Sequence, residues 1–178
     1  MDEKDLLTTD ELSMYRHQWY GKYNDDAVKV IYYTESKDLV FNHSHLTLVF
    51  NENNQLLEFG RLTKKNKGKV FTDEQAIKKA KDFINQVSHI KQHLELEEIE
   101  DQMRSFIDAD GHIINVPIVL VKYVNLDNHS FSWVAFNGEQ IAEYEREAYY
   151  DYRSGTGKTQ RWVIDNWLMD HQEELEIV

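Results

Sequence analysis

The 178-residue chain has no cysteine, which excludes a disulfide framework, a thiolate nucleophile and a cysteine metal site. No apolar run approaches the roughly 18 residues that a membrane helix needs, so we expect no membrane partner. The first residues are polar and acidic, unlike a secretory signal or a transit peptide. From these absences we expect a cytoplasmic protein.

Positive charge is scarce in the second part of the chain. Residues 1–70 hold 10 Lys and Arg against 11 Asp and Glu, whereas residues 71–178 hold 10 against 21. Such a field repels phosphates, so we expect no nucleic acid partner. The excess of Asp and Glu over Lys and Arg indicates a soluble protein. The alternative is that these residues bind a basic partner or a cation. Apolar residues make up 41% and aromatic residues 12% of the chain, which argues against disorder.

A stretch of the chain occurs twice in loose form. Residues 42–61 align with residues 128–146 after one residue is dropped, and eight of 19 aligned positions are identical. The offset of 86 residues, falling to 85, is close to half of the chain. Self-similarity at a fixed offset indicates one folding unit used twice.

Three segments are predicted to be helical. Thr9 opens the first, which we expect to run to about residue 20, before Gly21. Thr72 and Gln75 form a capping box at the start of the second. The third is expected to follow Thr159. Apolar residues at helical spacing mark the last two helices: Ala76, Ile77, Ala80, Phe83, Ile84 and Val87, and then Trp162, Val163, Trp167 and Leu168.

Strand patterns lie between the predicted helices. Residues 28–33 and 45–50 are rich in β-branched and aromatic side chains. Polar turns predict hairpins at residues 50–56 and 136–141, the latter around an Asn-Gly pair, and another hairpin joins residues 105–107 to 113–124. Pro117, the only proline, lacks an amide donor, so we expect it at a sheet edge or a bulge.

These patterns predict an α+β fold of two tandem related units, each a helix packed on an antiparallel β-meander, plus a C-terminal helix. The first unit is expected at residues 1–63 and the second, longer one at residues 71–178. The join, residues 64–69, is short and polar, so we expect the units to pack together.

Residues 71–84 resemble the opening helix of PepSY-like domains, with a Thr-Asp-Glu cap at Thr72, an Ala-Ile pair at Ala76 and another alanine at Ala80. The resemblance covers mainly residues 71–146 and extends faintly to residues 9–61. It implies a curled antiparallel sheet and a non-catalytic module that binds or restrains a protein partner. It implies no catalytic residues. PepSY domains are usually secreted or membrane-linked, and this chain carries neither signal.

Several residues suggest chemistry without completing a motif. Residues 155–159 read Gly-Thr-Gly-Lys-Thr, but the first glycine of a P-loop is replaced by Tyr152, so we expect no nucleotide site. Histidine pairs at His43 and His45, and at His89 and His93, have ligand-like spacing but lack a third ligand. We therefore predict no metal and no cofactor. The doubled Asn-His-Ser is interpreted as a strand-entry turn.

The aromatic run after the last hairpin is the best candidate for recognition, because Tyr and Arg are favoured at interface hot spots. The predicted partner-binding residues are Trp133, Tyr149, Tyr150, Tyr152 and Arg153. The alternative is that these rings seal the C-terminal helix onto the sheet. We expect a non-enzymatic interaction or regulatory module that binds a protein or peptide partner, at a sheet edge or at this aromatic patch. A small hydrolase or metal enzyme using His43, His45 or His129 and a small-ligand binder are the alternatives, and the oligomeric state stays open.

Overall fold

The computed structural model describes residues 3–63, 71–88, 93–151, 153, 156–171 and 176–177. Four helices and eleven strands are assigned in these ranges: α1 (Glu3–Leu6), α2 (Thr9–Leu12), β1 (Tyr15–Tyr23), β2 (Asp26–Thr34), β3 (His45–Asn51), β4 (Leu56–Leu62), α3 (Asp73–Val87), β5 (Leu94–Ile107), β6 (Ile113–Asn125), β7 (Phe131–Asn137), β8 (Gln140–Ala148), β9 (Tyr150–Asp151), β10 (Thr156–Gly157), α4 (Asp165–Asp170) and β11 (Glu176–Ile177). The join at residues 64–69 lies outside the described residues.

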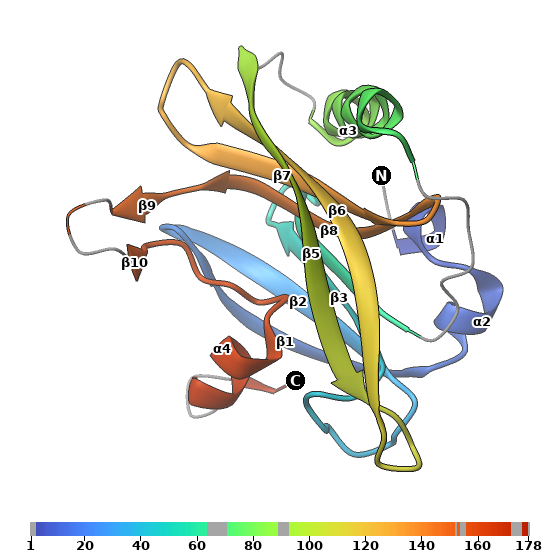
Figure 1. Ribbon diagram of the computed structural model, residues 1–178. Coiled ribbons are helices and arrows are strands. Elements are labelled where there is room, and N and C mark those ends of the chain that lie inside the picture. The colour runs from blue at the N-terminus through green and yellow to red at the C-terminus, as the bar shows by residue number, and fades with distance from the viewer. Residues whose placement is uncertain are drawn as a thin grey trace.

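Nine strands form one antiparallel sheet in the order β11-β1-β2-β3-β4-β8-β7-β6-β5, while β9 and β10 form a separate short hairpin (Figure 1). A first meander, β1 to β4, meets a second, β5 to β8, where β4 pairs with β8. In that pair Phe59 lies opposite Tyr144, the two residues that the sequence alignment equates. The prediction of two tandem units, each a helix packed on its own antiparallel β-meander, plus a C-terminal helix is wrong, because hydrogen bonds between β4 and β8 join both meanders into a single large sheet.

The helix predicted from Thr72 is confirmed as α3. The Thr72 hydroxyl accepts the Gln75 N–H, and the Gln75 side chain accepts the Thr72 N–H. The apolar stripe faces the sheet and its buried members are Ala76, Ala80, Phe83, Ile84 and Val87. Figure 1 shows α3 on one side of the sheet. The capping box therefore positions the helix that covers this face.

The other two predicted helices are much shorter than expected. α2 ends at Leu12, with Thr8 and not Thr9 as its N-cap, and the chain from Tyr15 continues as β1. All nine β1 residues pair with β2, so cross-strand pairing outweighs the local helix signal. α4 begins only at Asp165, because the Thr159 hydroxyl accepts the Tyr149 N–H and does not cap a helix.

The predicted strands and hairpins are confirmed. β2 and β3 contain the expected residues, and Gly138 takes the positive φ of 58° that the turn between β7 and β8 requires. The acidic stretch from Leu94 forms the first part of β5. β6 pairs with β7 only from Val119 onward, so at Pro117 it is paired with β5 alone. This half-paired position is the kind expected for proline, which has no amide N–H to donate.

The second face of the sheet is covered by a C-terminal segment, residues 156–171. Trp162 anchors it: the indole N–H donates to the Lys22 carbonyl at 2.8 Å, and the ring packs so closely on Gly21 that an added Cβ would lie 2.3 Å from it. Trp162 and Leu168 share an apolar cluster with Trp19, Val30 and other residues of the first meander. Burial of these rings holds the segment on the sheet.

The long β5–β6 hairpin bends over this same face. Arg104 on β5 forms an ion pair with Glu143 on β8, although two strands separate β5 from β8 in the sheet order. Phe106 packs with Ala135 and Ala142 nearby. The bend and the C-terminal segment together enclose the centre of the second face.

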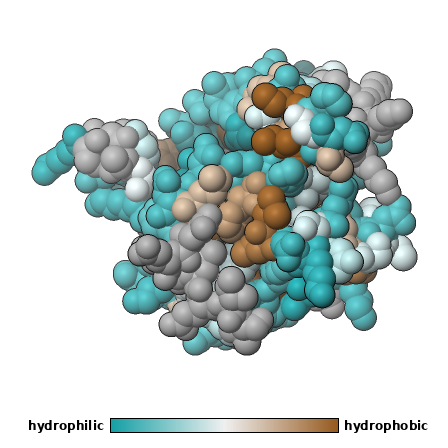
Figure 2. Space-filling model, turned by 90° about the horizontal axis from the view of Figure 1, so that it is seen from below, coloured by the Kyte–Doolittle hydropathy of each residue, from teal (hydrophilic) through white to brown (hydrophobic). Residues whose placement is uncertain are grey.

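The face seen in Figure 2 is mostly hydrophilic, with apolar surface confined to small patches. Within the described residues, no helix has the length and apolar character needed to cross a membrane. The large apolar side chains instead fill the clusters on the two faces of the sheet.

Candidate functional site

A cavity of about 430 Å³ lies on the second face, between β6, β7 and β8 and the C-terminal segment. We call it the aromatic cavity, because five rings line it: Phe131, Trp133, Tyr149, Tyr150 and Trp167. Its volume falls in the range of small-molecule pockets. Three of the five predicted partner-binding residues, Trp133, Tyr149 and Tyr150, therefore lie at one cavity.

Strand register places the walls of this cavity. Trp133 on β7 is the cross-strand partner of Glu145 on β8, and the register shifts between Phe131 and Trp133. At the end of β8, the Tyr149 N–H donates to the Thr159 hydroxyl at 2.8 Å. This bond holds the aromatic run beside the returning C-terminal segment.

Two cationic side chains reach the cavity. The Lys122 Nζ lies 4.4 Å from the centre of the Phe131 ring and 3.7 Å from a Glu98 carboxylate oxygen. The Arg161 guanidinium carbon lies 5.9 Å from the centre of the Trp133 ring. Both contacts are in the range of cation–π attraction. The Arg161 Nε is buried and has no hydrogen-bond partner.

Glu145 is the most unusual residue of the cavity. It is 1% exposed, and its Oε2 has no hydrogen-bond partner. Burial raises the pKa of this carboxyl to about 8, Arg161 opposes the rise and Glu143 adds to it. A buried carboxyl oxygen without a hydrogen-bond partner is costly, so such a group is a candidate for a role in binding.

Two neighbouring glutamates each accept hydrogen bonds, although Oε1 of Glu58, like Oε2 of Glu145, has no partner. Glu58 lies opposite Glu145 in the β4–β8 pair, and its Oε2 accepts the Trp162 backbone N–H at 3.1 Å. Burial and the charge of Glu145 raise the pKa of Glu58 well above its ordinary value. Glu143 is held by two hydrogen bonds from Arg104. Only Glu145 among the three lines the cavity.

The remaining predicted partner-binding residues lie apart from this cavity or outside the described residues. Arg153 is exposed in the turn between β9 and β10, where its backbone N–H donates to an Asp151 carboxylate oxygen at 2.9 Å. It does not line the aromatic cavity. Tyr152 lies outside the described residues.

The histidines do not converge on one site. His45 is buried, stacks on Tyr32 at 4.8 Å and lies 3.5 Å from Asp165 of α4. His129 follows β6 and takes a positive φ of 58°. Because β3 and β7 run in opposite directions in the sheet, the two Asn-His-Ser turns lie at opposite ends of it. His89 lies outside the described residues.

The two Asn-His-Ser turns hold their own backbone in different ways. The Asn128 carboxamide oxygen accepts both the N–H and the hydroxyl of Ser130. The Ser44 hydroxyl donates to Glu35 and not to His45. Neither serine is therefore arranged as the nucleophile of a catalytic triad.

One group of possible metal ligands occurs among the described residues, in the turn between β5 and β6. It consists of Asp108, Asp110 and His112, of which only Asp108 is buried. The Asp108 Oδ1 accepts the backbone N–H groups of Asp110 and His112, each at 2.9 Å. These bonds are those of a turn-forming aspartate and explain the cluster without an ion.

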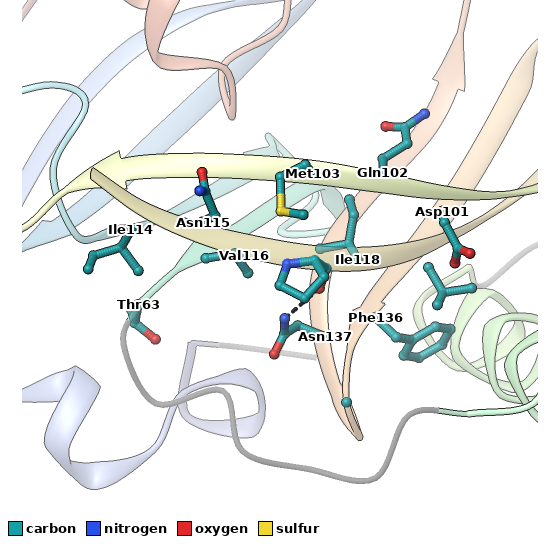
Figure 3. Close-up of a pocket in the computed structure, with 13 residues that line it drawn as sticks. Thr63, Asp101, Gln102, Met103, Ile114, Asn115, Val116, Ile118, Phe136 and Asn137 are labelled. Carbon is teal, nitrogen blue, oxygen red and sulfur yellow. Dashed lines mark hydrogen bonds between the residues drawn. The ribbon is translucent and has the colours of Figure 1, made fainter. Parts of the chain in front are cut away.

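A larger groove of about 640 Å³ follows the half-paired stretch of β6. Figure 3 shows its apolar side chains, among them Met103, Ile114 and Phe136, and the hydrogen bond from the Asn137 amide to the Pro117 carbonyl. Unlike the aromatic cavity, this groove has no buried ionisable side chain without a partner. We therefore take the aromatic cavity as the candidate site.

Several residues that line the cavity were not predicted from the sequence to bind a partner: Lys122, Phe131, Glu145, Arg161 and Trp167. One signal was present, since the alignment places Glu145 opposite Gly60 of the first copy, an exchange of glycine for a charged residue. Comparisons with protein-family models, curated proteins and solved structures find no match, so the resemblance to PepSY-like domains stays a prediction.

Proposed function

We propose that the protein is a non-enzymatic recognition module that binds a protein or peptide partner at the aromatic cavity. The observation that carries the proposal is the meeting of Trp133, Tyr149 and Tyr150 with the buried Glu145, whose Oε2 has no hydrogen-bond partner. Tyr149 and Tyr150 are partly exposed, so a partner side chain can reach the rings. Aromatic residues around a desolvated pocket are the usual centre of a binding interface.

Strand addition at a sheet edge is the less favoured route. The edge strand β5 carries exposed acidic residues in its first part, from Glu95 to Asp101, and charged edges oppose pairing with another strand. At the half-paired stretch of β6, Pro117 offers no N–H, and its carbonyl already accepts the Asn137 amide. Both features are typical of protected edges, which directs the proposal to the cavity.

Three further expectations from the sequence stay part of this proposal. The first is cytoplasmic location, and the second is descent of the two meanders from one duplicated unit. The pairing of Phe59 with Tyr144 supports the second, because the alignment equates them. The third is the kinship with PepSY-like domains, supported only by the capped helix α3 and the sheet that follows it.

A peptide selection tests the proposed function. A displayed random-peptide library is selected on the wild-type protein and counter-selected on Tyr150→Ala, a change at a side chain that is 46% exposed. We expect enriched peptides whose affinity for the variant is about tenfold lower, the usual loss at an aromatic hot spot.

Arg153→Ala serves as the matched control, since Arg153 is exposed and lies outside the cavity. We expect the enriched peptides to bind this variant as they bind the wild type. A library that yields no enriched sequence, or peptides that bind the Tyr150 variant equally well, would overturn the proposal.

A further inference from the structure

The aromatic cavity contains one buried acceptor and one buried donor that lack partners. The acceptor is Oε2 of Glu145 and the donor is the Nε–H of Arg161. No ion pair joins these two described side chains, although Arg161 lies close enough to lower the pKa of Glu145. An unpaired buried polar atom costs free energy, so a ligand that satisfies both atoms gains affinity.

A cationic ligand suits this site poorly. An ammonium group can donate to Glu145, but it leaves the Arg161 donor unpaired. It also meets the positive charges of Arg161 and Lys122, which already lie over the Trp133 and Phe131 rings. Like charges in a desolvated site repel strongly.

An anionic ligand meets the opposite obstacle. A carboxylate can accept from Arg161, but it has no hydrogen to donate to Oε2 of Glu145, which stays unpaired. Each charged class of ligand therefore satisfies one of the two unpaired atoms and leaves the other without a partner.

We propose that the aromatic cavity binds a planar, uncharged amide group, whose N–H donates to Oε2 of Glu145 and whose carbonyl oxygen accepts from Nε of Arg161. The inference rests on the proposed partner-binding function and names the group that the partner inserts. The side-chain amide of Asn or Gln and a small cyclic amide share this chemistry.

The aromatic walls agree with a flat ligand. Five rings surround the cavity, and flat groups make their largest contact with aromatic rings by lying along or against them. A site built to hydrogen-bond a ligand also rejects analogues that lack the matching groups. The arrangement thus predicts selectivity by hydrogen-bond pattern and not by charge.

Three probes with the same ring test this inference: benzamide, benzoate and benzylamine. Each is titrated into the wild-type protein, and binding is followed by the indole N–H signals of Trp133 and Trp167 in NMR spectra. We expect benzamide to bind in about the millimolar range, as suits a ligand of its size, and at least about tenfold more tightly than the two charged probes. Tighter binding of either charged probe would overturn the inference.

Two variants and one control locate the contact. Arg161→Met removes the donor and Glu145→Leu removes the acceptor, and each should weaken benzamide binding about tenfold. Glu143→Gln is the control, because Glu143 lies two residues away on β8 but is already held by Arg104. We expect this change to alter benzamide binding less than about twofold. If Glu145→Leu does not fold, Arg161→Met and the three probes still decide the question.

A second set of titrations distinguishes an amide on a protein partner from an amide on a small molecule. It also separates this inference from the proposed function. A capped Gly-Gln-Gly peptide and its Gly-Glu-Gly counterpart are titrated beside 2-piperidone, a free cyclic amide. Preference for the Gln peptide assigns the amide to a protein partner, and preference for 2-piperidone assigns it to a small molecule. Selected peptides that bind at Tyr150 while benzamide does not bind would overturn the inference and leave the proposed function standing.

Discussion

Two aligned positions on neighbouring central strands have opposite surroundings. Gly60 on β4 is covered by the C-terminal segment, and an added Cβ would lie 3.0 Å from Val163 Cβ. Its counterpart in the alignment, Glu145 on β8, lines the aromatic cavity and has an unpartnered oxygen. At this position the C-terminal segment packs directly on the first meander, whereas the second meander keeps a cavity with a buried carboxyl group on its floor.

This difference indicates that stability alone does not explain Glu145. A small residue at the same strand position allows the covering segment to pack, as Gly60 does under Val163. Glu143, two residues before Glu145, shows that the sheet can also satisfy a carboxylate on this face with Arg104. Glu145 has neither solution, which supports a role in binding.

The largest effect on stability is expected when Gly60 of the first meander is replaced by glutamate, the residue at the aligned position of the second meander. Gly60→Glu places a side chain against Val163 and a charge opposite Glu143, its cross-strand partner. We expect the free energy of unfolding to fall by about 3–5 kcal/mol, as for other uncompensated buried charges. Urea unfolding measures the change.

Gly60→Ala is the control for this prediction. It adds only one crowded methyl group, which should lower the free energy of unfolding by about 1–3 kcal/mol. Equal losses in the two variants would mean that the first meander also tolerates a buried carboxyl group, and the contrast with Glu145 would disappear.

The second prediction concerns pH and Glu145. A carboxyl whose folded pKa is about 8, against an ordinary 4.5, binds its proton more tightly in the folded state. Its contribution to stability therefore falls as the pH rises through this window, by at most about 1.4 kcal/mol per pH unit. The charged and titratable groups that face it are Glu58 on β4, Glu143 on β8, Tyr23 on β1 and Arg161 in the C-terminal segment.

Glu145→Gln removes this titration and leaves the other groups in place. We expect the variant to gain about 2 kcal/mol relative to the wild type between pH 6 and pH 8. Urea unfolding at both pH values measures the difference. A constant difference between the proteins would show that the Glu145 carboxyl ionises normally and is not confined.

The third prediction concerns Glu143, the glutamate that Arg104 holds. Arg104→Met leaves Glu143 without its two hydrogen bonds, and we expect a loss of about 1–2 kcal/mol in the free energy of unfolding. Lys122→Met is the matched control, because the ammonium group lies 3.7 Å from the half-exposed Glu98. Such a surface pair contributes less than about 1 kcal/mol. A larger loss for the Lys122 variant would reverse the ranking of the two contacts.

Local signals predicted the elements that depend on local interactions. The capping box of Thr72 and Gln75 identified α3, and the Asn-Gly turn at Gly138 identified the β7–β8 hairpin. The segment from Tyr15 was misjudged, because its strand character depends on pairing with β2. The join of β4 to β8 also could not be foreseen, since it depends on contacts between residues 85 apart such as Phe59 and Tyr144.

The candidate site was predicted only in part for the same reason. Trp133, Tyr149 and Tyr150 were found from residue type and from their closeness in the chain. Glu145 and Arg161 are common residue types, and their importance depends on one buried polar atom in each that has no hydrogen-bond partner. No sequence pattern reports that state, because it depends on how the C-terminal segment covers β8.

The smallest effect is expected at the capping boxes that open both meanders. Thr72→Ala should lower the free energy of unfolding by about 1 kcal/mol, because Thr72 starts the 15-residue helix α3. Thr8→Ala should cost less, about 0.5 kcal/mol, because α2 has one turn. In addition, its Glu11 is held independently by the buried Arg61, with Nε 2.9 Å from Oε1. Urea unfolding compares the two variants, and a larger loss at Thr8 would mean that the cap and not the ion pair secures the start of the first meander.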